Sequence, residues 1–581
     1  MKYEPIAKPR WADMVVKPNL RDYEAARREF QWQSIVGSLD WMPNGGLNMA
    51  HECIDRHCFT WRKNKVALYW VGKDGGSEKY TFQDLKHLTS RFANVLRGLG
   101  VQKGDRVFIF LGRIPELYVA TFGTLKAGAV VGPLFSAFGP EAVRDRLLDS
   151  GARVLVVSPD LQGRVDEIRS ELPDLKHVIV VDRSASGAAL RPGETNYYEA
   201  MSRASREGEV APTTADDYAI MHYTSGTTGK PKGAAHVHGA IQSQLATARY
   251  ILDIQEEDVY WCTADPGWVT GTSYGMFGPW SNGASSLVYE GPFCPEEWYQ
   301  IIQDYRVTVW YTAPTAIRML MKAGEELPRH YDFSSLRYLC SVGEPLNPEA
   351  IFWGQKVFGL PFHDNWWQTE TGSILIANYP VMDIRPGSMG KPFLGITAGI
   401  LSDSWEELPP GQEGHLAIRP GWPSMFRTYW NNPELYQSKF KNGWYITGDR
   451  GWQDEDGYFW FVGRADDVIN TAGHLVGPFE VESALIEHPA VAEAGVIGKP
   501  DPDRMEIIKA FVSLKVGHNP SEELKQEIRE FVRHRLAAHA YPREMEFVAS
   551  LPKTRSGKIM RRLLKARELG LPEGDTSTLE D

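Results

Sequence analysis

The stretch Tyr223-Thr-Ser-Gly-Thr-Thr-Gly-Lys-Pro-Lys-Gly233 holds three glycines, four Ser or Thr hydroxyls and two lysines within eleven residues. It follows a strand-like run, Tyr218-Ala-Ile-Met-His222. Glycines let the backbone approach a ligand, and hydroxyls and lysines supply donors and positive charge, so this loop suits a triphosphate. It is not a Walker A loop, because Pro231 follows Lys230 where that motif needs Ser or Thr. The alternative, a flexible polar loop, is disfavoured because so many suitable side chains coincide.

On both sides of this loop, short apolar runs alternate with helical patterns. Thr81 and Asp84 resemble a capping box, apolar residues then recur at helical spacing, and Gly100 suits a helix stop. Five runs read as buried strands: 106–111, 153–158, 177–182, 308–311 and 337–342. Short continuous apolar runs separated by helices predict parallel sheets in α/β layers.

The pattern changes at about residue 396, where Gly, Pro and aromatic residues become frequent. Short antiparallel strands joined by tight turns are expected there. A compact α+β pattern follows Asp466, with a helix near 521–536. Because 581 residues are too many for one hydrophobic core, we expect two or more domains. The predicted fold class is α/β: an N-terminal domain, 1–465, of layered α/β subdomains plus a small β-rich subdomain, and a small mobile α+β C-terminal domain, 466–581.

Charge and composition exclude several classes of protein. The net charge of −11 argues against a nucleic-acid or anionic-membrane binder, which needs a basic face. The first eleven residues lack the apolar core of a signal peptide, and no run of 18 apolar residues predicts a membrane span. Five cysteines suit a reducing compartment, so we expect a cytoplasmic protein without nucleic-acid or membrane partners.

One cluster raises the question of zinc. His51, Cys53, His57 and Cys58 fall within eight residues. Structural zinc sites usually draw ligands from two separated pairs, so a helix with two buried cysteines is the favoured interpretation.

Five further motifs follow the phosphate-suited loop in order. They are Ser341-Val-Gly-Glu-Pro345, His363-Asp-Asn-Trp-Trp-Gln-Thr-Glu-Thr-Gly372, Tyr445-Ile-Thr-Gly-Asp449, Gly463-Arg-Ala-Asp-Asp-Val468 and Pro552-Lys-Thr-Arg-Ser-Gly-Lys558. Together the six resemble the signatures of the adenylate-forming superfamily, which includes acyl-CoA synthetases, luciferases and peptide-synthetase adenylation domains. The match covers nearly the whole chain and is closest to the acetyl-CoA synthetase branch. The resemblance implies that acetate, ATP and CoA give acetyl-CoA, AMP and diphosphate through an acetyl-adenylate, with rotation of the C-terminal domain.

The resemblance also implies which residues bind ATP and Mg²⁺. Lys558 would bridge the carboxylate and the α-phosphate, Thr224 and Glu370 would help hold Mg²⁺, and Asp449 would hold the ribose hydroxyls. The other implied nucleotide contacts are Ser225, Gly226, Thr227, Thr228, Gly229, Lys230, Gly343, Glu344, Pro345, Asp364, Asn365, Trp366, Gln368, Thr369 and Arg464.

CoA is the third small-molecule partner that the resemblance implies. Asp466 would be the hinge of the domain rotation, and Ala472 and Gly473 would line the pantetheine tunnel. Arg164 and Arg533 align with arginines that bind the CoA phosphates, although either could be an ordinary surface arginine.

Two positions near the C-terminus need separate treatment. Leu475 stands where the family usually has an arginine near the nucleotide phosphate, so one positive charge is lost. His488, with the carbonyls of Ile486 and Val491, aligns with a cation-binding position, whereas a His before Pro489 alone is more often a turn residue.

A small acid is expected from the residues that align with the substrate pocket, Val269, Thr270, Val342 and Trp367. Longer-chain members of the family carry a small residue at the Trp367 position, and an indole there fills the space of a longer acyl tail. One methylene changes selectivity by only about 1–3 kcal/mol, so acetate is the first choice and propionate a poorer substrate.

Three alternatives remain open. The chain could be a propionyl-CoA synthetase or a ligase for another small acid. It could be a catalytically silent CoA- or nucleotide-binding regulator, which Leu475 faintly favours and the complete motifs of Lys558, Glu370 and Asp449 oppose. It could be a carrier-protein adenylation module, although no carrier domain follows in these 581 residues. Acylation of Lys558 by a lysine acetyltransferase, reversed by a deacetylase, is a further expectation, since it would remove the charge.

Overall fold

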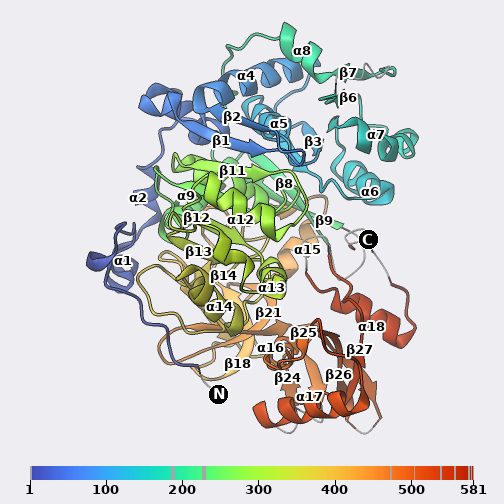
Figure 1. The fold of residues 1–581 in the computed structure, drawn as a ribbon. Coiled ribbons are helices and arrows are strands. Elements are labelled where there is room, and N and C mark those ends of the chain that lie inside the picture. The colour runs from blue at the N-terminus through green and yellow to red at the C-terminus, as the bar shows by residue number, and fades with distance from the viewer. Residues whose placement is uncertain are drawn as a thin grey trace.

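The computed structural model describes residues 3–184, 190–225, 231–471, 474–502, 504–536, 540–554 and 558–573, together with Thr576 and Leu579. Figure 1 shows the N-terminal portion as stacked layers of sheet and helix, with the C-terminal portion below them on one side. The expected α/β class is confirmed by this arrangement, and the described residues form three sheets.

The first sheet has eight strands in the order β19-β9-β8-β4-β3-β5-β6-β7. The strands are β3 (Arg106–Phe110), β4 (Val130–Pro133), β5 (Val154–Val157), β6 (His177–Val180), β7 (Glu194–Asn196), β8 (Tyr218–Ser225), β9 (Pro231–Val237) and β19 (Thr428–Tyr429). From β8 to β7 every pair is parallel, which confirms the three strands expected between residues 106 and 182. β8 and β9 are antiparallel and flank the glycine-rich loop.

Helices connect and cover this first sheet. They are α4 (Phe82–Gly98), α5 (Pro115–Lys126), α6 (Pro140–Ser150), α7 (Pro159–Asp166), α8 (Tyr197–Arg203) and α9 (Ile241–Tyr250). The predicted capping box is present at the start of α4, where Thr81 and Asp84 exchange hydrogen bonds. Gly100 has a φ of 77° just after this helix, a left-handed conformation that glycine adopts without strain.

The second sheet has 14 strands and changes character along its length. Its parallel part contains β1 (Val66–Val71), β10 (Val259–Cys262), β11 (Ser285–Tyr289), β12 (Val309–Thr312), β13 (Tyr338–Ser341) and β14 (Phe362–Trp366), with β2 (Ser77–Thr81) at the edge. Its antiparallel part contains β15 (Ile376–Ala377), β16 (Ser388–Pro392), β17 (Ala398–Leu401), β18 (Glu413–Ile418), β20 (Phe440–Lys441), β21 (Trp444–Gln453) and β22 (Phe459–Arg464). The antiparallel strands β17 to β22 confirm the change of pattern expected after residue 396.

The remaining N-terminal helices are distributed around these sheets. They are α1 (Tyr23–Glu29), α2 (Trp32–Val36), α3 (Met49–Cys53), α10 (Val269–Thr272), α11 (Gly278–Ser281), α12 (Pro295–Asp304), α13 (Pro314–Ala323), α14 (Pro348–Phe358) and α15 (Pro433–Ser438). Apolar residues of α12, α13 and α14 pack with strands β10 to β14 in one buried cluster. None of the described helices is long and apolar enough to cross a membrane.

The third sheet lies in the C-terminal portion. It consists of β23 (Ile469–Thr471), β24 (His474–Val476), β25 (Val491–Asp501), β26 (Met505–Leu514) and β27 (Glu544–Phe547), with α16 (Pro478–Ile486), α17 (Glu522–Arg535) and α18 (Arg561–Leu569). The expected helix near 521–536 is α17. The sheet begins three residues after Asp466 and has its own buried cluster, which includes Val481, Val496 and Ile528.

The N-terminal segment runs between the two portions of the molecule. Ile6 pairs with Ile384 in a short bridge. The Tyr3 hydroxyl lies 2.7 Å from a carboxylate oxygen of Glu349 in α14 and 2.9 Å from one of Glu487, which follows α16. Arg535 of α17 donates to the same hydroxyl at 3.3 Å. Tyr3 therefore contacts both the N-terminal and the C-terminal portion, and the division into two domains at residue 466 stays a prediction.

The side chains of the His/Cys cluster have separate partners. His51 Nε2 lies 3.0 Å from Asp40, and His57 Nε2 lies 2.7 Å from the carbonyl of Trp280. Cys53 is fully buried in α3. Among the described residues, no group of three or more His, Cys, Asp and Glu side chains is arranged to hold a metal ion.

Candidate active site

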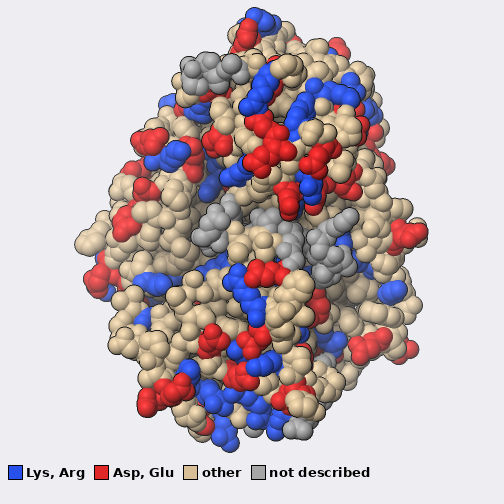
Figure 2. Space-filling model, turned by 90° about the vertical axis from the view of Figure 1, so that its right-hand side faces the viewer, with Lys and Arg blue, Asp and Glu red and all other residues tan. Residues whose placement is uncertain are grey.

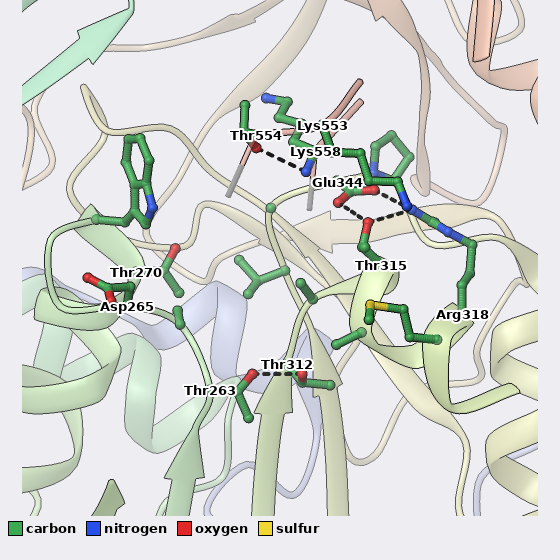
Figure 3. Close-up of a pocket in the computed structure, with 18 of the residues that line it drawn as sticks. Thr263, Asp265, Thr270, Thr312, Thr315, Arg318, Glu344, Lys553, Thr554 and Lys558 are labelled. Atoms are coloured by element: carbon green, nitrogen blue, oxygen red, sulfur yellow. Dashed lines mark hydrogen bonds and ion pairs between the residues drawn. The ribbon is translucent and has the colours of Figure 1, made fainter. Parts of the chain in front are cut away.

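A cavity of about 1470 Å³ lies where the ends of the parallel strands meet the C-terminal portion. Its walls include residues directly after β10, β12, β13 and β14, the end of β8, and the loop before α18. Ligands of open α/β sheets bind outside the carboxyl ends of the strands, so the position suits a binding site. Figure 3 shows Lys553 and Lys558 on one side of this space, opposite Thr263 and Thr312 at the strand ends.

Most of the residues singled out in the sequence converge on this cavity. Those among its lining are Thr224, Val269, Thr270, Val342, Gly343, Glu344, Pro345, Asp364, Asn365, Trp366, Trp367, Gln368, Thr369, Glu370, Asp449, Arg464, Ile486, Val491 and Lys558. They come from segments up to 334 residues apart in the chain, so only the fold brings them together.

Other predicted residues lie outside the lining or outside the described part. Gly226, Thr227, Thr228, Gly229, Lys230, Ala472 and Gly473 are not among the described residues, and for Ser225 and Leu475 only the backbone is described. Asp466 is exposed, with an oxygen 3.7 Å from Arg464. His488 is buried, and its Nδ1 accepts a hydrogen bond from the backbone N–H of Ala490.

The two predicted CoA arginines differ in their surroundings. Arg164 donates to the carbonyls of Ser136 and Phe138 at 2.9 Å each. Arg533 is exposed on α17, 3.4 Å from Glu530. Figure 2 shows blue Lys and Arg gathered at the lower end of one face, over the C-terminal portion. A role of either arginine toward CoA stays a prediction.

Asp449 is held at the cavity by three donors. It stands on β21 directly opposite Arg464 on β22, and its Oδ1 lies 3.3 Å from the guanidinium. Its Oδ2 accepts hydrogen bonds from the indole N–H of Trp366 at 2.9 Å and from Gln368 at 3.1 Å. Burial raises the pKa of Asp449, and the positive charge of Arg464 opposes that rise. The carboxylate is thus oriented before any ligand binds.

Glu344 is fixed by residues that the sequence motifs did not reveal. Its carboxylate accepts hydrogen bonds from Thr315 at 2.7 Å and from Arg318 at 2.7 Å, as Figure 3 shows. Arg318 and Thr315 lie in α13, and nothing in the sequence around them marks a site. Their role follows only from the packing of α13 beside the loop after β13.

Glu370 and Thr369 are also anchored from outside their motif. The hydroxyl of Tyr429 donates to Glu370 Oε1 at 2.7 Å. The Thr369 carbonyl lies 2.8 Å from His236 Nε2. Lys232, which pairs with Thr224 across β8 and β9, also lines the cavity. Burial lowers its pKa, and nearby Lys439 adds to that effect.

Lys558 reaches the cavity from the C-terminal portion. Its backbone N–H donates to Thr554 Oγ1 at 3.0 Å. Lys558 is exposed to the solvent inside the cavity, and the walls of the cavity surround it with protein. Desolvation lowers the pKa of its ammonium, Arg464 lowers it further, and Asp449 and Glu344 oppose the shift. The structure therefore presents Lys558 to the same space as Asp449 and Glu344.

The four residues predicted to wall the acid pocket all line the cavity. Val269 and Thr270 begin α10, Val342 follows β13, and Trp367 follows β14. Trp367 is partly buried and packs against the main apolar cluster of the N-terminal portion. Its indole stands edge to face with the ring of Tyr274, 5.1 Å between centroids. Binding sites for small molecules are commonly lined by such apolar and aromatic side chains, and the role of these four in selecting the acid stays a prediction.

Asp364 predicts a pH dependence of stability. Burial raises the pKa of Asp364 to about 8, although the backbone N–H groups of Leu346 and Asn365 partly oppose it. In the unfolded chain the pKa of an aspartate is about 3.9. At a pH between about 4 and about 8, the Asp364 carboxyl therefore keeps its proton in the folded protein and has lost it in the unfolded chain. The free energy of unfolding should therefore fall as pH rises from about 4 to about 8, and level off above that.

The variant Asp364→Asn tests this expectation, since its amide keeps a carbonyl acceptor for Leu346. Urea midpoints measured between about pH 5 and about pH 8 should slope less in the variant than in the wild-type protein. Parallel slopes in both proteins would assign the pH dependence to other groups.

Comparison with known proteins was consistent in sequence and in structure. The AMP-binding enzyme family matches residues 54–430, and the AMP-binding enzyme C-terminal domain matches residues 480–558. An acetyl-coenzyme A synthetase of Bacillus subtilis (strain 168) is 57% identical over 567 residues, covering 97% of this chain and 98% of that protein. One from Methanothrix thermoacetophila is 44% identical, covering 93% of this chain and 86% of the relative.

Solved structures agree. The anthranilate CoA ligase AuaEII in complex with anthranoyl-AMP has a TM-score of 0.84 at 32% identity, covering 93% of this chain and 99% of that one. A Brucella canis acyl-CoA synthetase has a TM-score of 0.74 at 37% identity, with 95% and 99% covered. The chain therefore belongs to the family of AMP-binding, adenylate-forming enzymes, as its motifs predicted. Within that family its similarity is to the acetyl-CoA synthetases.

Proposed function

We propose that this protein is an AMP-forming acetate–CoA ligase that uses the cavity described above for both half-reactions. One observation carries the proposal: Lys558 from the C-terminal portion lies in the same cavity as the oriented carboxylate of Asp449 and the walls formed by Val342 and Trp367. The match to acetyl-coenzyme A synthetases over 97% of the chain supports the choice of acid.

In the first half-reaction a carboxylate oxygen of acetate attacks the α-phosphorus of ATP, and the bond to diphosphate breaks. Negative charge spreads over the phosphoryl oxygens, so positioning and fixed positive charge lower the barrier. Lys558 supplies that charge between the acid and the α-phosphate. Asp449 accepts hydrogen bonds from the ribose hydroxyls, and Glu344 with its neighbours holds the adenine side. Arg464 keeps Asp449 in place and faces the nucleotide.

Mg²⁺ fits the donors present, as an ion that takes most of its ligands from phosphate oxygens and water. Glu370 offers one carboxylate, whose Oε1 accepts a hydrogen bond from Tyr429, and Thr224 offers a hydroxyl. When bound, the ion neutralises phosphate charge. The residues of this chain would orient it through Glu370 and Thr224.

In the second half-reaction the CoA thiol attacks the carbonyl carbon of acetyl-adenylate, and AMP leaves with the bonding electrons. The proposed rotation about Asp466 would withdraw Lys558 and admit pantetheine through a tunnel at Ala472 and Gly473. The contacts between the two portions in the present arrangement include polar ones, Tyr3 with Glu487 at 2.9 Å and Asn347 with Ser483 at 2.8 Å. They also include an aromatic one, Phe461 of β22 with Phe479 of α16, and the rotation would break all of them.

CoA-dependent AMP release with ATP and Mg²⁺ tests the function, measured across formate, acetate, propionate, butyrate and benzoate. A sharp optimum at acetate is the expected result. An optimum at a longer acid would keep the class of enzyme and overturn the pocket assignment. Absence of turnover with every acid would favour a silent CoA- or nucleotide-binding regulator, which the position of Leu475 in place of an arginine favours faintly.

The proposal extends to location and control. The acidic composition and the five cysteines support a cytoplasmic location.

Acetylation of Lys558 by a lysine acetyltransferase would remove its charge and stop adenylation, and a deacetylase would restore it. We expect mass spectrometry of native protein to find acylated Lys558 in a fraction with low adenylation rate. If the slowly reacting fraction carried only unmodified Lys558, the proposal that acetylation of Lys558 controls the enzyme would be wrong.

A further inference from the structure

The helix that carries two of the pocket walls contains an irregular turn. α10 (Val269–Thr272) continues into a π-helical turn, Ser273–Phe277, and then into α11 (Gly278–Ser281). The backbone N–H of Gly278 donates to the carbonyl of Ser273, five residues earlier. Such turns add a residue to one side of a helix and often occur at functional sites. Here the turn carries Tyr274, whose side chain is fully buried.

The hydroxyl of Tyr274 both accepts and donates a hydrogen bond within the protein. It accepts the backbone N–H of Ile374 at 2.7 Å. It lies 2.7 Å from Thr247 Oγ1, whose own proton goes to the Ser243 carbonyl at 2.6 Å, so Tyr274 donates to Thr247. Ile374 lies seven residues after Trp367, in the same loop. The hydroxyl therefore ties the π-helical turn to the segment that bears the indole.

The ring of Tyr274 meets the indole from behind. The rings of Tyr274 and Trp367 are 5.1 Å apart at 86°, and those of Tyr274 and Tyr311 are 5.9 Å apart at 87°. Trp367 lines the cavity, whereas Tyr274 is absent from the described residues of its lining. Tyr311 in turn donates to Asn365, two residues before Trp367, at 2.9 Å. The indole thus has the substrate space on one side and a fixed aromatic support on the other.

We infer that Tyr274 is a positioning residue for acid selectivity, because its ring holds the indole of Trp367 in the wall of the acid pocket. The inference rests on the proposed function, in which that indole limits the length of the acid. Without the ring, the indole gains room to turn away, and the space for an acyl tail lengthens. The hydroxyl has a different role, since its partners lie in the backbone and in α9 and not in the pocket.

The separation of ring from hydroxyl gives the first test. Tyr274→Leu removes the ring face, and the ratio of kcat/KM for acetate to that for butyrate should fall at least about tenfold, a change of about 1.4 kcal/mol. Tyr274→Phe keeps the ring and should hold the ratio within about twofold of wild type. It should lower the thermal midpoint, because the buried Ile374 N–H loses its acceptor.

A double-mutant cycle shows whether the effect passes through Trp367. In a Trp367→Gly background the indole is gone, so adding Tyr274→Leu should change the acetate-to-butyrate ratio by less than about twofold. Tyr299→Leu is a matched control, because this tyrosine is also fully buried. Its ring contacts Tyr331, Phe333 and Phe358, none of which is among the described lining of the cavity. It should lower stability and leave the ratio unchanged.

Two results would overturn the inference. One is a folded Tyr274→Leu protein with the wild-type ratio; the other is an equal change of the ratio with and without Trp367. If Tyr274→Leu does not fold, Tyr274→Met serves in the same measurements, since its flexible side chain fills space without a ring face. A wild-type protein without acid-dependent AMP release would instead refute the proposed function, which is a separate observation.

Discussion

Lys558→Ala should lower the rate of acetyl-adenylate formation at least about 10³-fold, while CoA attack on preformed acetyl-adenylate largely survives. Removing one fixed group that stabilises developing negative charge typically costs about 10²–10³ in rate, and in the proposed mechanism Lys558 places a full charge at the reacting atoms. In the second half-reaction the lysine is withdrawn by the proposed rotation, so its loss matters little there. Diphosphate exchange measures the first step, and thioester formation from added acetyl-adenylate measures the second.

Lys565→Ala provides the matched control for this experiment. Lys565 lies in α18, and its ammonium pairs with Glu506 at 3.2 Å, outside the described lining of the cavity. Its removal should leave both steps near the wild-type rate. An equal loss of both half-reactions in Lys558→Ala would contradict the assigned role, because a residue needed throughout is not specific to adenylation.

The lowered pKa of Lys558 adds a pH signature. Desolvation and Arg464 favour the neutral amine of Lys558. As the pH rises, the adenylation rate should therefore begin to decline below 10.5, the ordinary pKa of a lysine. Lys558→Arg keeps its charge at all accessible pH values and should lose that decline, at a lower overall rate.

Trp367→Gly should shift the preferred acid from acetate to longer acids. In the proposed acid pocket the indole of Trp367 limits the length of the acid, so its removal should open space for two or more methylenes. Each methylene of the acid that the enlarged pocket can accommodate changes selectivity by about 1–3 kcal/mol. The ratio of kcat/KM for butyrate to that for acetate should therefore rise by about 10² or more. The KM for ATP should stay near the wild-type value, since the nucleotide contacts come from other side chains. A variant with an unchanged chain-length profile would show that Trp367 does not limit the acid.

Much of the fold was predictable because local rules and the fold agree. The capping box of Thr81 and Asp84 and the apolar runs of β3, β5 and β6 appear in the structure as expected. The order of the strands was not predictable, since β8 pairs with β4 and β1 with β11 through contacts far apart in the chain. Periodicity reports which face is buried, whereas strand neighbours depend on packing of the whole domain.

For the site, the motifs located part of the polar lining of the cavity, but neither other lining residues such as Arg113, Asp265 and Arg561 nor the residues that hold the located ones. Arg318 and Thr315 fix Glu344, and Tyr429 holds Glu370, yet each lies in an ordinary helix or strand. Tyr274 has no motif of its own and is visible only through its ring contact with Trp367. Supporting residues act through their position in the folded protein, so no local sequence pattern marks them.

Tyr3 has a consequence for biosynthesis. Its partners Glu349 and Glu487 follow it in the chain by 346 and 484 residues, so both are synthesised after it. At translation rates of about 5–20 residues per second, the segment waits roughly 25–100 s before the second carboxylate emerges. Closing so long a loop costs little more free energy than a loop half as long, only about 0.6 kcal/mol. Tyr3 is thus made before both of its partners, and its contact with the C-terminal portion can form only after Glu487 has been made.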